Sequence, residues 1–173
     1  MIYGLFIITG FGLIALQTAF LPYVIGSLPL FDLVVPLMIY LGLYRSLSDG
    51  LLLALICGFL MDGLSGSPYG IYLATYIWLV VGVRGAANFL RVNNLLLRLL
   101  IVPAGIAMEN AIGIGSAILL QKEVINFAWV LPGLFFQLLW ATISGPILLW
   151  LFDIIVIRFE RWRNARRHIQ NHS

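Results

Sequence analysis

The placement of the charged residues constrains this chain more than any other feature. The first 31 residues carry no charged side chain, whereas residues 158–167 carry five arginines. Between these two regions the charges fall in short clusters that separate long apolar stretches. This pattern is typical of a protein that crosses a membrane several times, because charged side chains are costly in hydrocarbon and collect at its borders.

The composition indicates the same class of protein. The chain is 62% hydrophobic and only 10% charged, whereas an average soluble domain is about 25% charged. Its length of 173 residues suits one domain. The single cysteine, Cys57, lies in an apolar run, so the sequence offers neither a disulfide nor a cysteine-rich metal site. Residues 2–25 lack a basic start and a cleavage site, so we expect a retained first helix and no signal peptide.

Six apolar segments predict an all-α integral membrane protein with a six-transmembrane-helix bundle. A spanning helix needs about 20 mostly apolar residues, and segments 2–25, 69–90, 95–120 and 127–157 meet that length. Segments 32–44 and 51–60 are shorter, and a polar turn at residues 45–50 separates them. We expect two tilted spans that take in flanking residues, and a single re-entrant hairpin is the alternative. Residues 1–157 then form the transmembrane domain and residues 158–173 a basic tail.

The basic residues predict the orientation of this bundle. If both termini are cytoplasmic, nine of the ten basic residues lie on the cytoplasmic side. Only Lys122, beside Glu123, then lies outside. The opposite orientation reverses these numbers, so the positive-inside rule predicts cytoplasmic N- and C-termini.

Two aspartates lie near the outer ends of the short segments. Asp32 follows Pro29, and we expect its carboxylate to cap the following helix. Asp62 ends its own segment, where a carboxylate opposes the helix dipole. Two interpretations of Asp62 stay open: it accepts hydrogen bonds from the glycine-rich turn or another helix and holds the fold, or it contacts a partner or ligand.

Glu109 lies about fourteen residues into the fifth segment, beside Asn110, and no cation lies within a helical turn. A carboxylate at that depth is a site hypothesis by default. One interpretation is a hydrogen bond to Gln17, to Thr75 or to a backbone group that Pro103 leaves free. The other is a contact with a partner helix or a bound polar ligand.

The remaining polar and small residues have simpler interpretations. We expect Asp153 to form a local ion pair or interface contact. The tail arginines predict binding to anionic lipid headgroups; they are Arg158, Arg161, Arg163, Arg166 and Arg167. Small residues predict close helix packing inside the bundle; they are Gly12, Ala15 and Ala19 in the first segment and Gly82, Gly85 and Ala86 in the fourth.

Catalytic patterns are missing from the sequence, so we expect no enzyme, cofactor or metal site. The only histidines, His168 and His172, lie in the tail, and no nucleophile turn or phosphate loop occurs. The Asp62-Gly63 pair begins like a phospholipid alcohol-transferase signature, but its later aspartates do not follow. A transporter is the stronger alternative, because short, interrupted helices around residues 29–70 suit a ligand pocket open to the outside.

Several short motifs resemble the rod shape-determining protein MreD family. The first is Leu16-Gln17-Thr18 followed by Leu21-Pro22, and the second runs from Pro29 to Leu33. The strongest is a glycine-rich helix that ends in an aspartate and continues through a small-residue turn, and its residues here are Gly58, Asp62, Gly63, Gly66 and Gly70. Met61 and Gly63 depart from the family, in which leucines are commoner beside the aspartate. Glu109 matches the acidic residue often found in the fifth helix of that family, and residues 121–173 match in character only.

The resemblance implies a non-catalytic scaffold in the bacterial plasma (inner) membrane. Members of the family act with MreC, MreB, RodA and a class B penicillin-binding transpeptidase in lateral peptidoglycan synthesis, which maintains rod shape. It implies no nucleic-acid partner. It also implies a fold similar to the substrate-binding subunits of energy-coupling-factor transporters, so the alternative function is a vitamin-type substrate-binding subunit with a pocket near Asp32, Asp62 and Glu109.

Overall fold

The structure is a computed structural model. It describes the backbone of residues 2–20, 23, 32–66, 69–89, 95–121 and 127–170, and the side chains of residues 4–20, 23, 32–66, 69–87, 100–119 and 131–162. Several features predicted from the sequence lie outside these ranges. They are the turn at residues 26–29, the polar patch at residues 91–94, the connection that holds Lys122, and the side chains of Arg98, Arg163, Arg166 and Arg167.

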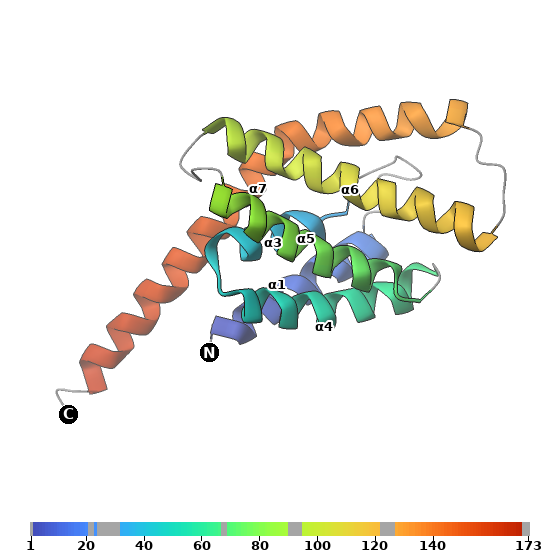
Figure 1. Ribbon diagram of the computed structural model, residues 1–173. Helices are drawn as coiled ribbons and strands as arrows, with labels where there is room; N and C mark the ends of the chain where they lie inside the picture. Colours follow the sequence, from blue (N-terminus) through green and yellow to red (C-terminus); the bar gives the residue numbers. More distant parts are fainter. Residues whose placement is uncertain are drawn as a thin grey trace.

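The described backbone is helical and contains no strand, which confirms the all-α prediction for this part of the chain. Its elements are α1 (Ile2–Ala15), a π-helical segment η1 (Leu16–Phe20), α3 (Val34–Tyr44), α4 (Leu47–Ser65), α5 (Ile71–Phe89), α6 (Leu95–Gln121) and α7 (Phe127–Gln170). Figure 1 shows the helices side by side in one bundle, with the C-terminal part of α7 leaving it.

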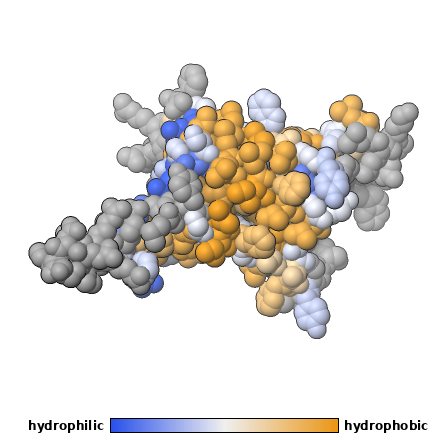
Figure 2. Space-filling model, turned by 90° about the horizontal axis from the view of Figure 1, so that it is seen from below, coloured by the Kyte–Doolittle hydropathy of each residue, from blue (hydrophilic) through white to orange (hydrophobic). Residues whose placement is uncertain are grey.

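Three of the described helices are long and apolar enough to cross a membrane, within Leu47–Ser65, Leu100–Leu119 and Leu131–Trp162. Figure 2 shows a broad hydrophobic surface over the middle of the molecule. A multi-pass arrangement of six spans stays a prediction, because the other apolar helices are shorter. The 11 residues of α3 rise about 16 Å, whereas the hydrocarbon core of a bilayer is about 30 Å thick.

Helix α3 forms the centre of the bundle. Its side chains from Val34 to Leu43 are all buried, and it contacts α1, α4, α5, α6 and α7. A helix that is apolar on every face suits either a protein core or the lipid of a membrane. The burial of α3 and its contacts with its neighbours, and not its sequence alone, show that it lies in the core.

The polar turn predicted at residues 45–50 is shorter in the structure. Ser46 caps α4, because its hydroxyl oxygen accepts the Asp49 N–H at 3.3 Å. A serine in this position satisfies an amide that has no partner within the helix. Asp49 and Gly50 consequently belong to the first turns of α4 and not to a loop, and α4 extends beyond the predicted segment 51–60 at both ends.

The glycine-rich turn after α4 is also shorter than predicted. Gly63 lies inside α4, which continues to Ser65. Gly66 follows with a φ of 70° and Gly70 has a φ of 97°. Only these two of the predicted turn glycines use the backbone freedom that favours glycine.

Helix α7 runs without interruption through the predicted domain boundary at residues 157–158. No glycine or proline follows Pro146, and arginine favours helix nearly as well as alanine does. The first part of the basic tail is therefore a continuation of the last helix. Two prolines, Pro132 and Pro146, lie earlier within it.

Of the six small residues chosen from the sequence for internal packing, only Ala86 is partly buried, and the other five are wrong. A Cβ atom added at Gly12, Gly82 or Gly85 would meet no atom within 4 Å, and Ala15 and Ala19 are exposed. The close approaches occur at other glycines, where an added Cβ would lie 3.0 Å or less from an atom of a neighbouring helix: Gly10, Gly42, Gly50, Gly58, Gly105 and Gly145. Spacing alone did not show which helical face is turned inward.

Candidate functional site

Asp62 is a buried carboxylate that holds the start of α5. Its side chain is 4% exposed. It accepts the N–H of Gly70 at 2.9 Å, of Tyr72 at 2.9 Å and of Leu73 at 3.3 Å. The first amides of a helix have no partners within it and carry partial positive charge. From the last turns of α4 the carboxylate therefore stabilises the N-terminus of α5, a contact of the kind expected from its fold-holding interpretation.

A ladder of small residues on α4 brings α5 within reach of Asp62. Gly50, Ala54, Gly58 and Asp62 recur every four residues and are all buried, so they share one helical face. A Cβ atom at Gly58 would lie 2.6 Å from the Leu73 Cα. Such close backbone approach is how helices pack in lipid. The four-residue period is present in the sequence, and it is the signal that would have identified this face.

Asp32 lies in a second buried group of polar side chains, and it is 5% exposed. Its Oδ1 accepts the Val34 N–H at 2.8 Å, which agrees with the predicted capping role. The hydroxyl of Tyr76, on α5, donates to its Oδ2. Gln17 also hydrogen-bonds to this carboxylate and accepts the Leu33 N–H at 2.9 Å.

This group, which we call the Asp32 cluster (Gln17, Asp32 and Tyr76), joins three elements. Gln17 comes from η1, Asp32 precedes α3, and Tyr76 comes from α5. A π-helical segment reorients its side chains relative to an α-helix and is frequent at functional positions. Sequence reasoning missed Tyr76, because a tyrosine in an apolar helix gives no signal of its partner.

Glu109 lies near the Asp32 cluster. It is partly buried on α6 and interacts electrostatically with Asp32 and Tyr76. Within the described residues, no hydrogen bond or ion pair engages its carboxylate. The hydrogen bonds described for Gln17 go to Leu33 and Asp32, and the Thr75 hydroxyl donates to the Ile71 carbonyl at 2.8 Å.

Asn110 has a separate role from its neighbour Glu109. Its side-chain amide donates to the Ile106 carbonyl at 2.8 Å and to Oε1 of Gln137 at 3.1 Å. This contact joins α6 to α7. The structure therefore places Gln17, Asp32 and Glu109 near one another. Asp62 instead joins α4 to α5, and Asn110 joins α6 to α7.

The opposite end of the bundle carries the described arginines. Arg45, at the C-terminus of α3, forms an ion pair with Glu160 at 3.2 Å. Its guanidinium lies over the Phe6 ring at 5.4 Å, and Arg84 donates to its carbonyl at 2.9 Å. Asp153 hydrogen-bonds to Tyr40, which places it at a local interface as expected. These contacts join α1, α3, α5 and α7.

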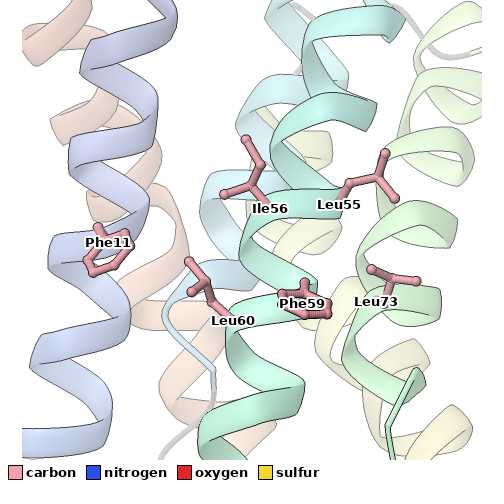
Figure 3. Close-up of a pocket in the computed structure, with 6 residues that line it drawn as sticks. All are labelled: Phe11, Leu55, Ile56, Phe59, Leu60 and Leu73. Atoms are coloured by element: carbon pink, nitrogen blue, oxygen red, sulfur yellow. The ribbon is translucent and has the colours of Figure 1, made fainter.

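An open groove, the α1–α4 groove, lies on the apolar side of the bundle. Its volume is about 510 Å³, and six apolar side chains line it: Phe11, Leu55, Ile56, Phe59, Leu60 and Leu73. Figure 3 shows four of them on α4, with Phe11 on α1 and Leu73 on α5. Phe59 is 69% exposed. This groove offers shape and apolar surface but no polar group for chemistry.

Groups of three or more histidine, cysteine, aspartate or glutamate side chains that would suit a metal ion do not occur among the described residues. Comparison with protein-family models, with curated proteins and with solved structures gives no match to this chain.

Proposed function

We propose that this chain is a non-catalytic membrane scaffold of the bacterial elongation machinery, as its resemblance to the MreD family implies. In this proposal it crosses the plasma membrane six times with both termini in the cytoplasm. It binds MreC and positions it beside MreB, RodA and a class B penicillin-binding transpeptidase. Its contribution to lateral peptidoglycan synthesis and rod shape is mechanical and involves no covalent chemistry.

The observation that carries this proposal is the α1–α4 groove. Its lining is apolar, and Phe11 and Phe59 are 57% and 69% exposed. A single apolar helix, such as the membrane span of MreC, packs against a groove of this kind through van der Waals contact, which drives helix association in lipid. The carboxylates of Asp32 and Asp62 bind backbone amides elsewhere in the bundle, and the groove lining carries no charge, which supports docking of an apolar helix there.

Site-specific crosslinking tests this proposal. A photo-crosslinking residue at Phe59 should capture MreC from the same genome in membranes, because Phe59 lies in the groove. The same residue at Phe135 is the matched control, since Phe135 is 67% exposed on α7 and lies outside this groove. Equal capture at both positions, or capture at neither, would contradict docking in the groove.

A second candidate function is a substrate-binding subunit of a small-molecule transporter. Glu109 favours it, because its partly buried carboxylate lies near the Asp32 cluster and has no hydrogen bond within the described residues. A bound ligand would raise the free energy of unfolding by RT ln(1 + L/Kd), where L is the free ligand concentration, and thermal stability would rise with it. We would purify the protein in mild detergent and identify what accompanies it. An ATPase-containing transport module and a vitamin-type molecule, without MreC, would favour this function over the scaffold.

A further inference from the structure

A close contact between α1 and α4 lies beside the α1–α4 groove. A Cβ atom added at Gly10, on α1, would lie 2.8 Å from the Sγ atom of Cys57, on α4. Both residues are buried. They directly adjoin two residues of the groove lining, since Phe11 follows Gly10 and Ile56 precedes Cys57. The distance between α1 and α4 at this contact therefore determines the distance between the two sides of the groove.

Of these two helices, α1 is the one that can move. It packs against α3 and α4, whereas α4 is also held by α5 through the hydrogen bonds of Asp62 and the close approach at Gly58. A Cβ at Gly10 would also lie 3.6 Å from Cδ2 of Leu37, on α3. Because α3 and α4 both limit the space at Gly10, a larger side chain there would push α1 outward.

Movement of α1 would alter the groove through Phe11. Figure 3 shows Phe11 on α1, whereas the other five lining residues lie on α4 and α5. Contact between apolar side chains is sensitive to distance, and a gap of about 0.5–1 Å removes about a quarter to a half of the attraction. An apolar helix that is held in lipid by such contacts would therefore bind less well to a wider groove.

We propose that Gly10 is a positioning residue for the groove and determines which helix fits it. Because it has no side chain, α1 stays close to Cys57, and Phe11 stays at the distance from α4 that admits one row of apolar side chains from a partner helix. Side chains four residues apart form such a row, and rows of this kind pack into grooves. Gly10 does not contact the partner and acts through Phe11. This inference rests on the proposed function, in which the membrane span of MreC docks in the groove.

The variant Gly10→Cys tests this inference in two states of one chain. While both thiols are reduced, the added side chain crowds Cys57 and should push α1 outward. The distance of 2.8 Å from the position of its Cβ to the Cys57 Sγ is close to the distance of about 3 Å between such atoms across a disulfide. Oxidation by diamide should therefore join the two thiols and hold α1 against α4. Photo-crosslinking from Phe59 to MreC should fall in the reduced variant and recover after oxidation.

Two control variants separate groove width from stability. Gly12→Cys adds the same side chain where a Cβ meets nothing within 4 Å, so its capture of MreC should not change on oxidation. In Gly145→Ala the new Cβ would lie 2.7 Å from the Val102 Cβ, between α7 and α6. This variant should lower stability and leave capture from Phe59 unchanged, because it does not move α1.

The outcomes distinguish this inference from the proposed function. Undiminished capture by reduced Gly10→Cys would overturn the inference and leave docking in the groove standing. Capture that falls equally in Gly145→Ala would also overturn it, because stability alone would then explain the loss. Thiols that stay open to a maleimide after oxidation would show that the close contact between α1 and α4 is absent. Absence of capture by the chain without substitutions would contradict the proposed function, and the inference with it.

Discussion

The two ends of the bundle solve the problem of charge in opposite ways. At one end, the carboxylates of Asp32 and Asp62 are 5% and 4% exposed and bind backbone amides and a tyrosine hydroxyl. At the other end, the side chains of Arg45 and Glu160 are 22% and 40% exposed and bind each other. Backbone amides at a helix start are neutral groups with fixed direction, so they stabilise a buried anion without bringing in a second charge to desolvate.

This difference predicts where the fold is vulnerable. A buried carboxylate that binds several amides leaves all of them without partners when it is removed. When one partner of an exposed ion pair is removed, water can hydrate the charged group that remains. We therefore expect substitutions at the aspartate end to reduce stability much more than substitutions at the arginine end.

The largest effect is expected from Asp62→Ala. It leaves the N–H groups of Gly70, Tyr72 and Leu73 without their acceptor, and we expect the free energy of unfolding to fall by about 3 kcal/mol. Denaturation by sodium dodecyl sulfate in mixed micelles measures this quantity. Asp62→Asn is the control, because its one carbonyl oxygen still accepts hydrogen bonds. Equal stability of the two variants would show that the amides find other partners.

The second-largest loss of stability is expected from Gly58→Ala, because Gly58 lets α5 pack closely against α4. In Gly58→Ala the new Cβ would lie 2.6 Å from the Leu73 Cα, so the two helices must separate, at a cost of about 2 kcal/mol. Gly63→Ala is a matched control on the same helix, since a Cβ there meets nothing within 4 Å. It should leave stability unchanged or raise it by about 0.5 kcal/mol. The same micelle denaturation measures both, and a similar loss in both variants would contradict the close packing.

Much of the helical architecture could be predicted from the sequence, but its contacts could not. Apolar segments predict the helices, and the Asp32 carboxylate accepts the first amide of α3 as expected. Glycine positions predict the breaks less well, because Gly50 and Gly63 lie inside α4. The partner of Asp62 depends on how α5 returns along α4, so no local pattern identifies Leu73 or Tyr72. Tyr76 lies 44 residues after Asp32, and only the fold brings them together. The exposed positions of Gly12 and Gly82 likewise depend on which neighbours surround each helix.

A moderate effect is expected from Tyr76→Phe. The ring still fills its buried position, whereas the carboxylate of Asp32 loses the hydroxyl that donates to it. We expect a loss of about 1.5 kcal/mol, because a buried acceptor is left with fewer partners. Tyr69→Phe is the control, since Tyr69 is 81% exposed two residues before the start of α5. If both variants unfold at the same detergent fraction, the Tyr76 hydroxyl contributes nothing to this end of the bundle.

The smallest effect is expected at the arginine end, from Glu160→Gln. The ion pair with Arg45 is partly exposed, and pairs of this kind contribute less than about 1 kcal/mol. Arg45 also lies over the Phe6 ring, so it keeps a packing contact after the carboxylate is lost.

A double-mutant cycle with Arg45→Gln, measured at low and high salt, isolates the pair from that contact. Its coupling energy should fall as salt rises, whereas the effect of Asp62→Ala should not change, because a buried group is screened much less. A coupling energy between Arg45 and Glu160 as large as the loss of stability in Asp62→Ala would mean that water is excluded from this end of the bundle as well.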